Sequence, residues 1–438
     1  MTLPVTIVLA RVLAPSGLGE YQTLNRTMLV AVGVGVLGYP HAIAWAAART
    51  NAEGALHKLR RMTLVASTIG SIVAVVMFCA IYIAVVGERD WGLFVLFAAV
   101  AALSVFNANL NNYFRGRLDV ASLMITRLGQ AMVWLACIVG LAALGALSVA
   151  TASATLLSTM AVAVLAGALI MRRETATRKD FGTSNLPEAQ SEQTSFSQLS
   201  RFAARVFPGL AIREWSVNAD QIAVALLLTV HDVGLYAVAA SIALALGLFT
   251  GPLTNTIQPV IQRASTLAEA RVAAAKYFAA TTWVVGLPVI AIASTAHWIV
   301  PLFYGAAYRE SVPVLILLLC GALVSAFNAS SQGILLGLGR PGTASVMIAT
   351  GFAASVILWI LLARSLGLTG IATGVVLGGC ISLAMQYTRV CRRLEMSAWD
   401  LLGQTASSTI PVAIAILGAF RRELFSRKSA NRGGPSAV

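Results

Sequence analysis

Twelve runs of about 20 apolar residues follow one another along this chain, each long enough to cross the hydrocarbon of a bilayer as a helix. They lie near residues 27–48, 62–86, 91–114, 121–143, 147–171, 207–230, 233–260, 278–300, 311–336, 343–364, 369–391 and 402–420. Because lipid offers no hydrogen-bond partner to an open strand edge, such runs predict helices. Only 11% of the residues are charged, against about 25% in soluble domains. The fold class is therefore an all-α polytopic membrane protein.

The chain also begins with a short apolar stretch. Val5 to Leu13 are too few residues to span a bilayer. Neither a Lys/Arg-rich region nor a small-residue cleavage pattern marks this stretch as a signal peptide. We expect the opening helix to be truncated.

Two segments far apart in the chain have nearly the same sequence. Phe106-Asn107-Ala108 recurs as Phe327-Asn328-Ala329, and the copies run on to Gly116 and Gly337. A second echo pairs the segment that ends at Tyr21 with the segment that ends at Tyr236. The offset drifts in one direction, from 215 residues at the tyrosines to 221 at the Phe-Asn-Ala motifs. A duplicated half predicts two six-helix lobes related by a pseudo-twofold axis along the membrane normal, with about 12–13 transmembrane helices.

The short loops assign the two sides of the membrane through their Lys and Arg residues. Nineteen lie in one alternate set of loops: Arg49, Lys58, Arg60, Arg61, Arg115, Arg117, Arg172, Arg173, Arg178, Lys179, Arg201, Arg205, Arg263, Arg271, Lys276, Arg340, Arg389, Arg392 and Arg393. The opposite loops hold four: Arg26, Arg89, Arg309 and Arg364. The first set is therefore predicted to be cytoplasmic, and the net charge of +14 is mostly a topology signal. Nucleic-acid binding is not indicated, because no basic face carries aromatic or motif support.

Changes in composition divide the chain into five parts. These are an N-terminal transmembrane lobe (1–171), a polar cytoplasmic linker (172–205), a C-terminal transmembrane lobe (206–395), an additional apolar helix (396–420) and a basic disordered tail (421–438). A span at 402–420 places the basic tail outside, against the trend of the other loops. Three alternatives remain open: the tail is tolerated there, the segment is re-entrant, or a partner span is missing.

The segment from Ala10 to Tyr21, which reads Ala-Arg-Val-Leu-Ala-Pro-Ser-Gly-Leu-Gly-Glu-Tyr, resembles the opening element of polysaccharide flippases. The region around Asp220, followed by Val233-Gly234-Leu235-Tyr236-Ala237, is also similar to that family, which belongs to the multidrug/oligosaccharidyl-lipid/polysaccharide exporter superfamily. The resemblance covers most of residues 5–395. It implies a translocase of lipid-linked oligosaccharides that works by alternating access, with two lobes rocking around a central cavity.

Ionisable side chains inside the membrane are costly, so they usually face a cavity or a partner. Asp220 is the acid that we place deepest, and we expect it to couple transport to an ion or to pair with an arginine. Arg11, Arg127 and Arg213 are candidate ligands for a pyrophosphate, because the planar guanidinium binds phosphate oxygens two at a time. The alternatives are an ion pair between helices for Asp220 and snorkelling to the headgroups for the arginines.

Two stripes of amides share the repeat. Asn107 and Asn111 lie on one helix face, and Asn328 and Gln332 lie on the equivalent face of the second half. Such stripes are candidates for hydrogen bonds to sugar hydroxyls. They are equally typical of polar contacts that hold membrane helices together.

The favoured hypothesis is a transporter in the cell (inner) membrane that flips undecaprenyl-pyrophosphate-linked oligosaccharide repeat units for surface polysaccharide biosynthesis. The partners expected are the lipid-linked oligosaccharide, the bilayer and a polymerase or ligase of the same pathway; no cofactor is expected beyond coupled Na+ or H+. One alternative is a cation-coupled multidrug antiporter of the same superfamily. Another is a membrane-embedded polysaccharide ligase or glycosyltransferase, which the short outer loops disfavour because they offer no catalytic motif.

Overall fold

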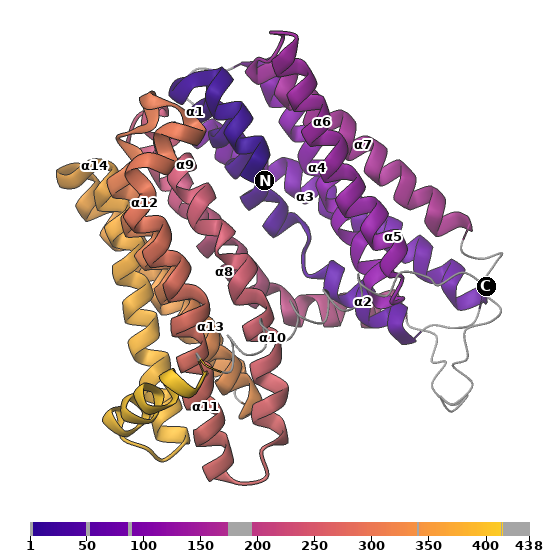
Figure 1. Ribbon diagram of the computed structural model, residues 1–438. Coiled ribbons are helices and arrows are strands. Elements are labelled where there is room, and N and C mark those ends of the chain that lie inside the picture. Colours follow the sequence, from indigo (N-terminus) through magenta and orange to yellow (C-terminus); the bar gives the residue numbers. More distant parts are fainter. Residues whose placement is uncertain are drawn as a thin grey trace, which may run out of the picture. The chain divides into compact units, whose positions relative to one another are not determined.

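The computed structural model describes residues 3–49, 53–85, 90–173, 195–339, 341–412 and 414. Within these ranges every regular element is a helix, as the apolar runs predicted (Figure 1). Nine of the described helices are long and apolar enough to cross a membrane. The prediction of an all-α membrane protein is confirmed.

The first half of the chain contains the elements up to α7. These are α1 (Leu3–Gly35), α2 (Tyr39–Arg49), α3 (Glu53–Val85), α4 (Trp91–Gly116), α5 (Val120–Met124), the π-helical turn η1 (Ile125–Gly129), α6 (Gln130–Ala143) and α7 (Val149–Arg173). Helices α3, α4 and α7 pack side by side, and α6 lies against α7 (Figure 1).

The second half starts with α8 after the residues left undescribed. It contains α8 (Phe196–Leu227), α9 (Val230–Ala245), α10 (Gly247–Arg263), α11 (Leu267–Thr281), the π-helical turn η3 (Thr282–Gly286), α12 (Leu287–Tyr304), the 3-10 turn η4 (Ala306–Tyr308), α13 (Ser311–Gly337) and α14 (Pro341–Arg393). Residues 398–412 form a further helix. Helix α14 holds two predicted spans, which meet at a kink where Gly367 has a φ of 57°.

The segment between the opening apolar stretch and the run at 27–48, which holds Arg26, was predicted to be an outer loop at residues 14–26, and this prediction is wrong. Helix α1 continues through it and is interrupted only at Ala14, whose φ of 54° marks a kink directly before Pro15. Residues 15–35 are therefore helical, and the predicted span at 27–48 begins earlier than the apolar run suggested. That span is also broken at 36–38, where Leu37 and Gly38 have positive φ values.

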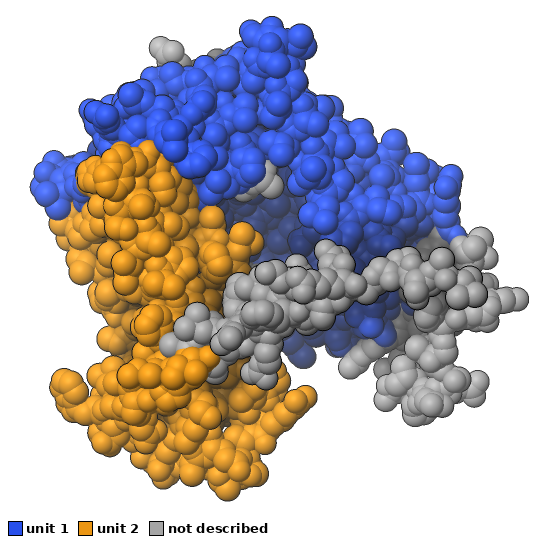
Figure 2. Space-filling view, viewed as in Figure 1, with its two compact units in different colours: residues 1–241, 300–311, 363–371 blue, residues 242–299, 312–362, 372–438 orange. Residues whose placement is uncertain are grey.

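The described chain forms two compact units. Unit 1 comprises residues 1–241, 300–311 and 363–371, and unit 2 comprises residues 242–299, 312–362 and 372–438 (Figure 2). Unit 1 contains the first half together with α8 and most of α9. The lobe boundaries drawn from composition stay predictions.

Parts of the predicted linker and tail lie outside the described residues. Helix α7 reaches Arg173 and α8 begins at Phe196, with Ser195 as its N-cap, so both ends of the predicted linker 172–205 are helical. Residues 174–194 and 415–438 are not among those described.

The repeated motif has the same packing role in both halves. A Cβ at Gly116 would lie 2.8 Å from the Cβ of Ala47 on α2, and a Cβ at Gly337 would lie 2.7 Å from the Cβ of Ile261 on α10. Each glycine is the last residue of the helix that carries the motif, and its missing side chain allows that helix to touch an earlier helix of the chain. The sequence echo preserves a close helix contact in each copy.

A second close contact joins α1 and α3 in unit 1. A Cβ at Gly35 would lie 2.7 Å from the carbonyl oxygen of Gly70, and a Cβ at Gly70 would lie 2.9 Å from Cγ1 of Val105 on α4. The backbones approach each other because neither glycine has a side chain. Van der Waals packing of this kind stabilises helix bundles in lipid, where no hydrophobic force drives helices together.

We predict that Gly70→Val forces α1 and α3 apart and lowers the free energy of unfolding by about 1–3 kcal/mol, the usual effect of overpacking. Thermal unfolding of the purified protein in detergent measures this. Gly140→Val on α6 is the matched control, because a Cβ there meets nothing within 4 Å. Equal losses in the two variants would contradict the packing argument.

Candidate functional site

A buried arginine joins the first half of the chain to α8. Arg26 on α1 is 7% exposed, and its Nη1 donates a hydrogen bond of 2.7 Å to Oδ1 of Asn218 on α8. The Asn218 Nδ2 donates in turn to the backbone oxygen of Glu214 at 2.9 Å. The amide is thereby oriented with its oxygen toward the guanidinium.

Asp220 lies two residues further along α8 and is half-buried. Its Oδ2 accepts a hydrogen bond of 2.9 Å from the hydroxyl of Tyr236, which is fully buried on α9, and its Oδ1 accepts one of 2.8 Å from the Gln221 N–H. The charge of Arg26 acts on this carboxylate. Three helices, α1, α8 and α9, thus position one cation and one anion close together.

The pair lies deep in the helices. Arg26 is twelve residues past the kink at Ala14, which at 1.5 Å per residue corresponds to about 18 Å along α1. The hydrocarbon core is about 30 Å thick. Arg26 thus lies more than half of that thickness away from the kink, and ionisable side chains within apolar helices usually mark functional sites.

The site has unused hydrogen-bonding capacity. Among the described residues, no group bonds to Nε of Arg26 or to either amide atom of Gln221, which is 1% exposed. Buried polar atoms without partners are rare in folded proteins because each costs free energy. The arrangement is therefore able to bind a further polar or anionic group.

The three predicted phosphate ligands lie elsewhere. Arg11 is exposed and donates from Nε to the backbone oxygen of Phe303 at 2.8 Å, and from Nη2 to that of Leu302. It thereby caps the C-terminal turn of α12, a position that favours cations. Arg127 is exposed on the π-helical turn η1. The side chain of Arg213 lies outside the described residues.

The first amide stripe forms a network between helices. Asn111 donates from Nδ2 to Oδ1 of Asn107 at 3.1 Å and accepts a hydrogen bond of 2.8 Å from the hydroxyl of Thr126 on η1. Asn107 donates to Gln130 on α6 at 3.1 Å and to the sulfur of Met160 on α7 at 3.5 Å. Both asparagines are buried, so in this conformation they hold helices together. Their role in substrate binding stays a prediction.

The second amide stripe repeats that contact in unit 2. Asn328 on α13 donates to the backbone oxygen of Gly379 on α14 at 3.0 Å and accepts a hydrogen bond of 2.9 Å from Gln386. Gln332, one turn later, is half-buried. Asn107 and Asn328, which are equivalent in the repeat, thus both donate hydrogen bonds to a neighbouring helix, although to different acceptors.

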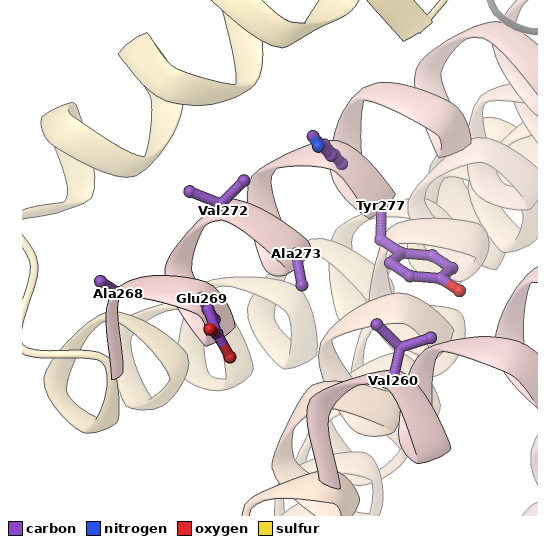
Figure 3. Close-up of a pocket in the computed structure, with 7 residues that line it drawn as sticks. Val260, Ala268, Glu269, Val272, Ala273 and Tyr277 are labelled. Carbon is purple, nitrogen blue, oxygen red and sulfur yellow. The ribbon is translucent and has the colours of Figure 1, made fainter. Parts of the chain in front are cut away.

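A groove of about 520 Å3 lies on unit 2 between α10 and α11 (Figure 3). Val260, Val272, Ala273 and Tyr277 are among its lining residues. None of the predicted site residues lines it, so it does not extend the site around Arg26. Among the described residues, no group of His, Cys, Asp and Glu side chains forms a metal site.

Asp220 was predictable from the sequence as a site residue, but its partners were not. Arg26 was assigned to an outer loop, and Asn218 and Tyr236 were not singled out as site residues. One signal was available: the 215-residue offset that pairs Tyr21 with Tyr236 also pairs residues 15–35 with residues 230–250. Because 233–260 was predicted to be a helix, the repeat predicts a helix through Arg26.

A family model described as "Polysaccharide biosynthesis protein" matches residues 1–265. The match covers more than half of the 438 residues, and the chain belongs to this family. A search of curated proteins found no matching sequence.

Solved transporters share the fold. An inward-facing multidrug resistance transporter of the MATE family and MOP superfamily superposes with a TM-score of 0.69 at 15% identity, covering 90% of this chain and 95% of that one. The lipid II flippase MurJ, in an inward closed conformation, gives 0.64 at 11% identity, with 95% and 91% covered. A MOP superfamily transporter from Pyrococcus furiosus gives 0.51 at 14% identity, with 90% and 96% covered. The chain thus has the two-lobe helical fold of these solved transporters, and the nine long apolar helices among its described residues are those of a multi-pass membrane protein.

We predict that Arg26 and Asp220 stabilise the protein interdependently. Arg26→Leu removes a charged hydrogen bond and leaves Asp220 without its neighbouring cation, at a cost of about 1.5–3 kcal/mol. In Arg26→Leu/Asp220→Asn the uncompensated carboxylate is gone, so the double variant should lose less than the sum of the single variants. Thermal unfolding in detergent of the wild type, both single variants and the double variant gives the double-mutant cycle. Strict additivity would show that the two groups do not interact.

We also predict that Asn111 contributes to stability through contacts between helices. Asn111→Ala removes the bonds to Asn107 and Thr126 and should lower the free energy of unfolding by about 0.6–1.7 kcal/mol. Asn112→Ala is the control, because among the described residues the Asn112 side chain bonds only to Ala108 of its own helix, so its loss should cost less. The comparison uses thermal unfolding in lipid nanodiscs. A larger loss in Asn112→Ala would refute the network.

Proposed function

We propose that the protein flips undecaprenyl-pyrophosphate-linked oligosaccharide repeat units from the cytoplasmic to the outer leaflet of the cytoplasmic membrane. The units would supply a surface polysaccharide, and a polymerase or ligase of the same pathway would act on them next. The family, whose description is polysaccharide biosynthesis, supports this substrate class. So does the fold shared with a lipid II flippase.

The buried guanidinium of Arg26 is the observation that carries the proposal. A diphosphate needs charge-assisted donors, and arginine supplies them in a planar fork. Asn218 occupies one nitrogen of that fork, while Nε has no partner among the described residues. Arg26 therefore replaces Arg11, which caps α12, as the first candidate ligand of the diphosphate. Arg127 and Arg213 remain candidates for the same anion at other stages of transport.

Asp220 is the proposed coupling residue. It is a membrane-embedded carboxylate held by Tyr236 on a neighbouring helix, so loss or gain of its charge changes a contact between α8 and α9. We assign it to coupling with H+ or Na+. Because Asp220 lies close to Arg26, gain or loss of charge on the carboxylate alters the electrostatic field at the guanidinium that is proposed to bind the anion.

A second candidate is a cation-coupled multidrug antiporter. Asp220 supports it, because a carboxylate in the membrane is able to bind a cationic drug in exchange for an ion. The similarity to MATE transporters is in line with this alternative. The adjacent Arg26 argues against it, since a guanidinium beside the carboxylate repels a cation.

We predict that proteoliposomes containing the protein flip a labelled undecaprenyl-diphosphate oligosaccharide. Arg26→Gln should slow flipping about tenfold or more, because charged hydrogen bonds contribute about 1.5–3 kcal/mol. Arg364→Gln, which removes an exposed arginine, should leave the rate unchanged. Flipping is measured by the accessibility of the glycan to an added lectin.

Other results would point elsewhere. Equal rates in the wild type and Arg26→Gln would remove Arg26 from the diphosphate site. An absence of flipping in every form, together with ion-driven uptake of a cationic dye that Asp220→Asn abolishes, would favour the antiporter.

A further inference from the structure

Two glycines in unit 1 place main chain directly against main chain. A Cβ at Gly19 on α1 would overlap the carbonyl oxygen of Val230 and lie 2.9 Å from its carbonyl carbon. A Cβ at Gly234 on α9 would overlap the carbonyl oxygen of Pro15 and lie 2.8 Å from its carbonyl carbon. No side chain other than hydrogen fits at either position.

The contact is reciprocal under the internal repeat. Gly19 and Gly234 are 215 residues apart, and so are their two partners, Pro15 and Val230. Gly19 faces Val230. Gly234, the equivalent of Gly19 in the second repeat, faces Pro15, which is the equivalent of Val230 in the first. Such reciprocity is expected where a pseudo-twofold axis passes between two helices, because the same surface then meets itself.

Other contacts at this end of unit 1 also use main-chain acceptors. Arg11 donates to the carbonyls of Leu302 and Phe303, and Tyr308 donates from its hydroxyl to the backbone oxygen of Ala10 at 3.1 Å. The loop charges of the sequence assign this end to the outer side. Elements of the first and second repeats are thus joined here by backbone contacts and by donors to backbone carbonyls.

We propose that the reciprocal glycine contact is a releasable closure of the outer end of the transporter. Interdigitated side chains must repack when helices separate, whereas two backbones that touch at glycines come apart without changing a rotamer. The hydrogen bonds of Arg11 and Tyr308 end on carbonyls, which water is able to satisfy after separation. The inference requires a transporter that opens outward and does not depend on its substrate.

The test measures the distance across the contact. Spin labels are attached to Ser16→Cys and His231→Cys, which are exposed, equivalent positions beside Pro15 and Val230, after alanine replaces the five native cysteines. In lipid nanodiscs the wild-type contacts should give a major short distance and a minor longer one. Gly19→Ala and Gly234→Ala should each make the longer distance the major population.

Gly17→Ala is the matched control. Its Cβ would meet the side chains of Leu13 and Val149 and not α9, so the wild-type distribution should persist. If both alanine variants at the contact also keep that distribution, the proposal is overturned. If either variant fails to fold, Arg11→Gln with Tyr308→Phe should lengthen the distance through loss of the flanking bonds, and an unchanged distance there overturns it equally. If the distances lengthen but the protein flips no lipid-linked oligosaccharide, the proposed closure still stands and the proposed function is refuted.

Discussion

Each backbone polar group of this chain in the hydrocarbon must find its hydrogen bond within its own helix, because lipid supplies none. That constraint explains the helical architecture of the described residues and limits how helices hold each other. Without water to expel, contacts depend on close packing and on a few polar bonds. The chain uses both: Gly35, Gly70, Gly116 and Gly337 bring backbones together, and Asn107 and Asn328 donate hydrogen bonds to neighbouring helices.

The internal repeat preserves packing and not the charged site. Tyr21 and Tyr236 are equivalent, but the offset of 215 places Ser241 opposite Arg26 and Val5 opposite Asp220. The cation and the carboxylate thus have no charged equivalents in the other half of the chain. Duplication supplies a symmetric scaffold of helices, while the polar cluster of Arg26, Asn218 and Asp220 belongs to one side of it. An asymmetric site suits a substrate that has no twofold symmetry of its own.

Much of the fold was predictable because it depends on local composition. Apolar runs identified most of the helices from α3 to α14, although α11 lies mainly between two of the predicted runs, and the echo of Phe106-Asn107-Ala108 predicted the two-lobe plan. The error at 14–26 has a clear cause. Gln22, Thr23, Asn25 and Arg26 read as a polar loop, yet they are buried between helices. Hydropathy records the polarity of a side chain but not whether lipid or protein surrounds it.

The sequence by itself therefore determined the solvent, the helical class, the repeat and the presence of an acid, Asp220, within an apolar segment, since each follows from residue type and spacing along the chain. Only the tertiary structure decided which cation accompanies that carboxylate. Arg26 and Asn218 are 192 positions apart and meet through the packing of α1 against α8. The same holds for Gly19 and Gly234, whose contact needs both helices in place. Hydrogen bonds and steric overlap act over a few ångströms in space, and no pattern along one helix specifies its neighbour.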